Sequence, residues 1–129
     1  MHTIRKEQFA VFQKVASQNF ENRMLSHIKK CFPKQMQELG EPRMRELIRY
    51  GIQRTASYRI RKQPDICMYI DIMIVFGRDF DRDPALPWAS GILGDKSLPG
   101  PAAKIIELHK AAIQCKNREE GHNGEPQPS

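Results

Sequence analysis

Basic side chains are concentrated between residues 43 and 62, where seven of them accompany one acidic residue, Glu46, giving +6. At about 100° per residue of helix, four residues of this segment would fall along one flank as a stripe. The stripe consists of Arg43, Tyr50, Arg54 and Arg61. Arg45 and Arg49 would fall on the other flank. Arginines so placed can bind phosphates or an acidic protein surface through bidentate, charge-assisted hydrogen bonds. The alternative is a solvated face whose arginines partly pair with carboxylates of the acidic C-terminal half.

Asp71 is a second candidate, because it stands in the middle of the most apolar stretch of the chain, residues 65–76. A carboxylate in such surroundings is costly unless it is paired or hydrogen-bonded. We therefore expect Asp71 to have a structural role, as the internal partner of an arginine such as Arg54 or Arg49. A catalytic acid or base would need a second polar group nearby, and none stands at helical spacing.

Alternating aspartates after the apolar stretch form a third candidate, since Asp79, Asp81 and Asp83 resemble the opening of a calcium-binding loop. The pattern then breaks, with Pro84 where the sharp-turn glycine belongs and Ser90 where the closing glutamate belongs. We expect Asp83 to cap a helix that begins at Pro84. Asp79 and Asp81 join the stripe as candidate contacts for a partner.

The remaining titratable residues indicate no catalytic or metal-binding site. The four histidines and three cysteines are His2, His27, His109, His122, Cys31, Cys67 and Cys115, and their spacing matches no metal-ligand motif. A glycine-rich phosphate loop and a nucleophile elbow are also missing from the sequence. We therefore expect no metal, no cofactor and no enzymatic activity.

Apolar residues at three- and four-residue steps predict an all-helical fold. The expected segments are residues 5–32, 35–39, 42–58, 65–76, 85–93 and 101–115. The stretch 65–76 is apolar on nearly every side, which is typical of a central helix, although its composition also suits a buried strand. The prediction is an antiparallel bundle of four main helices plus short helices, with 65–76 at its centre. Within the third segment, the close approach of another helix would explain Gly51.

The length of 129 residues predicts one helical domain, residues 1–116, followed by a disordered tail, 117–129, that has no apolar side chain. No window of 18 apolar residues occurs, and the N-terminus lacks an apolar signal core. Three widely separated cysteines also favour reduced thiols. These features predict a cytoplasmic protein that does not enter a membrane.

Several stretches together resemble a group of small bacterial proteins encoded beside type VI secretion spike and effector genes. The clearest are Gly77-Arg78-Asp79-Phe80-Asp81, Pro84-Ala85-Leu86-Pro87-Trp88-Ala89 and Arg49-Tyr50-Gly51-Ile52. The likeness covers about residues 4–113. It implies an accessory role, either as an immunity protein that neutralises a toxin or as an adaptor that delivers an effector to the spike.

Together these observations predict a non-enzymatic module that binds a secreted toxin or effector. A component of the secretion spike is a further candidate partner. The expected contact residues are Arg43, Tyr50, Arg54, Arg61, Asp79 and Asp81. A nucleic-acid-binding regulator that uses the basic segment 43–62 is the alternative, although no helix-turn-helix, zinc-finger or RNA-recognition signature supports it. An enzyme centred on Asp71 is a third possibility.

Overall fold

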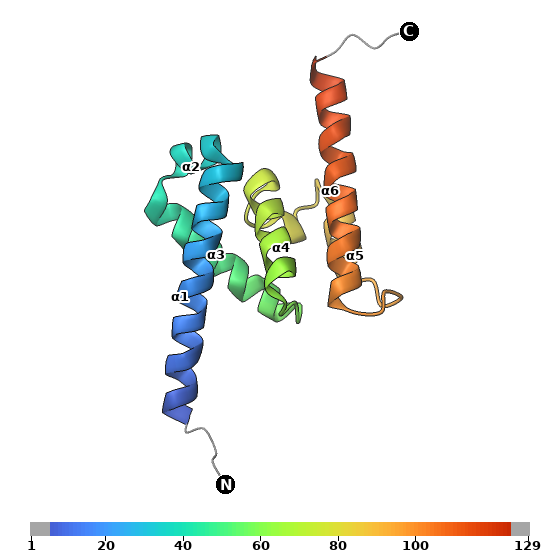
Figure 1. The fold of residues 1–129 in the computed structure, drawn as a ribbon. Helices are drawn as coiled ribbons and strands as arrows, with labels where there is room; N and C mark the ends of the chain where they lie inside the picture. Colours follow the sequence, from blue (N-terminus) through green and yellow to red (C-terminus); the bar gives the residue numbers. More distant parts are fainter. Residues whose placement is uncertain (1–5, 125–129) are drawn as a thin grey trace. The chain divides into compact units, whose positions relative to one another are not determined.

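The computed structural model describes the backbone of residues 6–124 and the side chains of residues 18–118. This part of the chain consists of six α-helices and one short 3₁₀ helix, without a strand (Figure 1). The all-helical fold class is confirmed, and the apolar stretch 65–76 lies in a helix. None of the helices within residues 6–124 combines the length and the apolar composition that a bilayer span requires.

Residue contacts group the chain into two compact units, residues 1–50 and residues 51–129. The first unit holds α1 (Lys6–Cys31), α2 (Pro33–Leu39) and the first part of α3 (Glu41–Ser57). The second holds the last turns of α3, then α4 (Gln63–Phe76), η1 (Phe80–Arg82), α5 (Pro87–Leu93) and α6 (Pro101–Gly124). A single domain over 1–116 stays a prediction.

In the first unit, α1 buries the face that its spacing predicts. Phe20, Met24 and Ile28 of this helix are buried, as are Met44 and Ile48 of α3. The earlier members of the expected face on α1, Phe9, Phe12 and Ala16, lie outside the described side chains. The helices are separated by Phe32 before Pro33 and by Gly40, whose φ of 84° suits a glycine.

In the second unit, α4 supplies much of the core. Tyr69, Ile70, Ile72 and Met73 of α4 are buried, and α6 packs against both α4 and α5. The residues that α6 buries are Ile105, Leu108 and Ala112, which stand at helical spacing.

The close approach predicted at Gly51 is confirmed within this unit. A Cβ atom on Gly51 would lie 2.6 Å from Cγ1 of Ile70 and 3.0 Å from the sulfur of Met73. A glycine therefore lets the backbone of α3 meet the side chains of α4.

Several predicted helix ends are wrong. Two helices, α2 and α4, begin at Pro33 and Gln63, two residues before the predicted starts. The short helix α5 begins at Pro87 rather than near residue 85, and Asp83 does not cap it. The Oδ1 atom of Asp83 instead accepts a hydrogen bond from the backbone N–H of Ala85, at 2.9 Å. The last helix continues past Cys115 to Gly124, so the first part of the predicted tail is helical. Residues 125–129 of that tail lie outside the described residues.

Candidate functional site

Two arginines of the basic segment are held by a carboxylate within the first unit. Glu21 of α1 accepts hydrogen bonds from Nη1 of Arg45, at 2.6 Å, and from Nε of Arg49, at 2.7 Å. The Glu21 side chain is only 8% exposed. Burial opposes its ionisation, but the hydrogen bonds from Arg49 and Arg45 outweigh that effect and lower the pKa of Glu21. This flank of the segment therefore stabilises the unit internally.

Arg54, a member of the predicted stripe, forms a polar cluster inside the second unit. Its guanidinium pairs with the carboxylate of Asp81, to which Nε donates at 3.1 Å. The hydroxyl of Tyr58 donates to the same Oδ2 atom at 2.6 Å, and Nη2 of Arg54 donates to that hydroxyl at 3.0 Å. The Asp81 side chain is fully buried, whereas Arg54 is 22% exposed. The cluster ties the end of α3 to η1.

Electrostatics within the cluster follow from its geometry. The hydrogen bond with Asp81 raises the pKa of Arg54, although burial opposes this effect. Burial and then the hydrogen bond with Asp81 raise the pKa of Tyr58 from 10.0 to about 12. Both groups therefore keep their protons across the physiological range.

Arg54 and Asp81 were expected to contact a partner, and the structure pairs them with each other instead. The carboxylate that binds Arg54 is Asp81, not Asp71 as the apolar surroundings of Asp71 predicted. Asp71 is half-buried in α4. No signal in the sequence distinguishes Asp81 from its neighbours Asp79 and Asp83, because all three stand in one polar loop.

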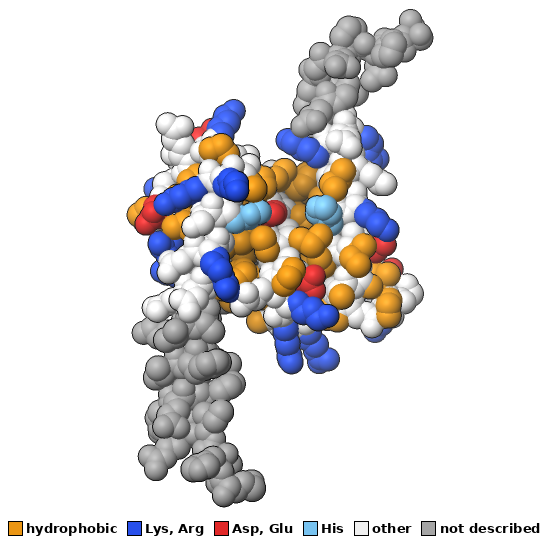
Figure 2. Space-filling model, viewed as in Figure 1, with side chains coloured by type: hydrophobic (Ala, Val, Ile, Leu, Met, Phe, Trp, Pro, Cys, Tyr) orange, Lys and Arg blue, Asp and Glu red, His pale blue; other side chains and the backbone are white. Residues whose placement is uncertain are grey.

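The exposed cations of the second unit gather in the connection between α3 and α4, residues 59–62, which we call the basic loop. Arg59, Arg61 and Lys62 are exposed, whereas Ile60 is 1% exposed and anchors the loop in the core. The N–H of Ile60 donates to the carbonyl of Thr55 at 2.9 Å, and Arg59 adopts a φ of 63°. Figure 2 shows basic side chains where this connection lies in Figure 1.

The three cations of the basic loop are available to a partner. Among residues 18–118, no carboxylate forms an ion pair with any of them. A left-handed backbone is unfavourable for a residue with a side chain, by roughly 1 kcal/mol, and glycine usually occupies this position at a helix end. The loop therefore carries an arginine where local stability favours glycine.

The other predicted contact residues are dispersed. Arg43 is exposed on the part of α3 that belongs to the first unit, and Tyr50 at the end of that part is half-buried. Asp79 is exposed in the turn between α4 and η1 and pairs with Arg82 at 3.1 Å. Of the stripe, only Arg61 therefore lies in the basic loop.

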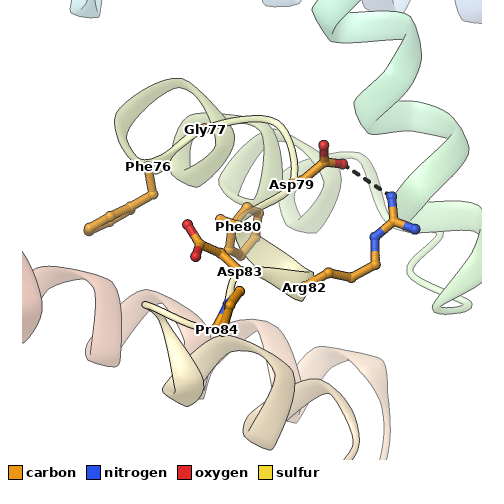
Figure 3. Close-up of a pocket in the computed structure, with 7 residues that line it drawn as sticks. All are labelled: Phe76, Gly77, Asp79, Phe80, Arg82, Asp83 and Pro84. Carbon is orange, nitrogen blue, oxygen red and sulfur yellow. Dashed lines mark hydrogen bonds and ion pairs between the residues drawn. The ribbon is translucent and has the colours of Figure 1, made fainter.

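A solvent-open pocket of about 280 Å³ lies at the corner where α4 passes into η1 (Figure 3). We call it the corner pocket, and it is lined by Phe76, Gly77, Asp79, Phe80, Arg82, Asp83 and Pro84. In the close-up, the carboxylate of Asp83 points toward the side on which the Phe76 ring lies, while Asp79 and Arg82 pair on the opposite side. Trp88 packs against the Phe76 ring with the centroids 5.4 Å apart. The pocket thus has an aromatic wall and a charged rim.

Comparison with known protein families, curated proteins and solved structures finds no match for this chain.

Proposed function

We propose that this chain is a protein-binding module that acts by occupying a partner, and that the basic loop contacts an acidic surface of that partner. The observation that supports the proposal is the exposure of Arg59, Arg61 and Lys62 without an ion pair among the described residues. The buried side chain of Ile60 fixes the loop, so the cations project from a held backbone. Such preorganisation reduces the entropy lost on binding.

The state of the other arginines favours a protein partner over nucleic acid. Arg45 and Arg49 pair with Glu21, and Arg54 pairs with Asp81, so three of the seven cations of the segment 43–62 are engaged in internal ion pairs. Nucleic-acid affinity rises with the number of phosphates neutralised, and specific binders make roughly 6–10 such contacts. Three cations in one short loop are better suited to a small acidic area on a protein.

The resemblance to proteins encoded beside type VI secretion genes suggests the class of partner. We propose a secreted toxin or effector, which the chain neutralises as an immunity protein or carries to the secretion spike as an adaptor. Either role requires stoichiometric binding in the cytoplasm and no catalysis.

Co-expression tests this proposal. If the chain is an immunity protein, cells that produce a candidate toxin from a neighbouring gene should survive when the chain is also produced, and the two proteins should co-purify in a 1:1 complex. A complex without protection would instead indicate an adaptor. If neither protection nor a complex is observed, and the chain binds duplex DNA, the nucleic-acid alternative would replace this proposal.

A further inference from the structure

We infer that the corner pocket binds a guanidinium cation, and that its source is an arginine side chain of a protein partner. The source rests on the proposed protein-binding function, whereas the chemistry of the cation rests on the pocket alone. The basic loop does not line this pocket.

The charge of the rim favours a cation. Asp79 and Asp83 place two carboxylates against one guanidinium, that of Arg82, in a chain whose net charge is +6. Arg82 is engaged with Oδ1 of Asp79, at 3.1 Å. Asp83 uses Oδ1 to accept the N–H of Ala85, and no donor to its Oδ2 is found among the described residues. One carboxylate oxygen at the rim therefore has room for an incoming donor.

The wall of the pocket favours a planar cation over a compact one. The half-buried ring of Phe76 is the aromatic face that the pocket presents. Phe80, 1% exposed, and Trp88, whose ring lies 5.4 Å from that of Phe76, support this ring from the core. A guanidinium stacks on aromatic faces while its edge donates to a carboxylate, whereas an ammonium is more strongly hydrated and has no planar face. The combination of Asp83 with the ring of Phe76 matches a guanidinium.

The openness of the pocket favours a side chain over a free ligand. Its volume of about 280 Å³ is open to solvent at the α4–η1 corner. Sites for small molecules usually enclose most of the ligand in roughly 300–1,000 Å³. The lining residues would contact the guanidinium end of one arginine side chain. The backbone of that arginine would stay outside the pocket, as part of the partner protein.

Titration of the full-length, ¹⁵N-labelled protein with N-acetyl-arginine amide tests the inference. We expect saturable shifts of the backbone amides of residues 76–83, with a dissociation constant on the order of 1–10 mM, which is typical of a probe of this size. The neutral isostere N-acetyl-citrulline amide should cause no saturable shift, and N-acetyl-lysine amide should bind more weakly.

Variants of the rim sharpen the test. Asp83→Asn keeps an oxygen for the N–H of Ala85 and should weaken binding of the arginine probe about tenfold, since a charge-assisted hydrogen bond is lost. Asp95→Asn is the matched control, because Asp95 makes the same turn contact with Ser97, at 2.9 Å, away from the pocket. It should bind like the wild type. Arg82→Gln removes a competing cation and should strengthen binding by about two- to fivefold.

Three results would overturn the inference. Equal binding of the citrulline and arginine probes would remove the role of charge. Equal binding by the Asp83→Asn and Asp95→Asn variants, or shifts that map outside the corner pocket, would remove the site. Free arginine binding about tenfold more tightly than the capped probe would assign the pocket to a free amino acid instead of a partner's side chain. Because these probes need no protein partner, their failure is distinguishable from failure of the proposed function.

Discussion

Replacing Asp81 with asparagine removes a charge from a fully buried side chain that accepts hydrogen bonds from Arg54 and Tyr58. The guanidinium of Arg54, 22% exposed, would then lack its counter-ion. We expect the free energy of unfolding to fall by about 2–4 kcal/mol, in the range for a broken, largely buried pair. Urea denaturation measures this value.

Asp79→Asn is the control for that change. Asp79 and Arg82 are paired at the surface, with side chains 55% and 61% exposed. Loss of this ion pair should therefore lower the free energy of unfolding by less than about 0.5 kcal/mol. If the two variants lose the same stability, the buried cluster does not hold η1 to α3.

Tyr58 makes the stability of the same cluster depend on pH. The pKa of Tyr58 is raised from 10.0 to about 12, first by burial and then by its hydrogen bond with Asp81. Between these values the unfolded chain has released the proton and the folded chain has not, so added base favours unfolding. The contribution of Tyr58 is therefore complete below pH 10.0 and is lost as pH rises through about 12.

Tyr58→Phe should reduce the decrease in the free energy of unfolding that occurs between about pH 9 and about pH 11. We expect the effect at about pH 11 to be no more than about 1 kcal/mol, because the ring is only half-buried. Urea denaturation of both proteins at about pH 9 and about pH 11 measures it. If the wild type and the variant lose the same stability between these pH values, ionisation of Tyr58 does not cause the loss.

The Arg54–Asp81 pair could not be read from the sequence. The two residues are 27 positions apart, and helical periodicity relates only residues within a few turns. Apolar neighbours made Asp71 the expected partner, although a side chain in a polar loop can be buried when an adjacent residue, here Phe80, is drawn into the core.

Among the helices, the contact of α3 with α4 gives a sharp prediction at Gly51. Gly51→Ala gains about 1 kcal/mol of helix propensity, but its Cβ would lie 2.6 Å from Ile70. Overpacking of this kind costs about 1–3 kcal/mol, so we expect a net loss of up to about 2 kcal/mol in the free energy of unfolding.

Gly91→Ala in α5 is the matched control. No atom lies within 4 Å of the position that its Cβ would occupy, so the substitution should stabilise the protein by up to about 1 kcal/mol. Thermal or urea denaturation compares the two variants. Stabilisation by both would mean that α3 and α4 do not meet closely at Gly51.

The helices themselves were predicted well from the sequence, whereas their ends were not. Phe20, Met24 and Ile28 recur at the spacing of a buried face, and they are buried. The start of α5 was misplaced because Pro84 and Pro87 are equally suited to the first turn of a helix. The end of α6 was missed because residues 117–124 have no apolar side chain and include two glycines, Gly121 and Gly124, so neither periodicity nor propensity indicates a helix there.

For the whole molecule, the sequence predicts where positive charge accumulates but not which cations remain available. Glu21 engages Arg45 and Arg49, and Asp81 engages Arg54. Tertiary pairs of this kind leave exposed only Arg43 and the basic loop among the cations of the segment 43–62 that lack an ion pair within residues 18–118. The corner pocket was also missed, although all its lining residues lie within 76–84. Asp79 was expected to contact a partner and Asp83 to cap a helix, and periodicity does not predict the turn that brings both beside Phe76.

Charge reversal in the basic loop tests the central claim most directly. Binding of the wild type and of Arg61→Glu with Lys62→Glu is titrated, at low and physiological salt, against the partner that the co-expression experiment identifies. Lys96→Glu with Lys116→Glu is the control, since it changes the net charge equally at exposed positions outside the loop. We expect the loop variant to weaken binding at least about tenfold and the control to change it by less than about threefold. Equal weakening by both variants, or retained affinity in the loop variant, would contradict the account.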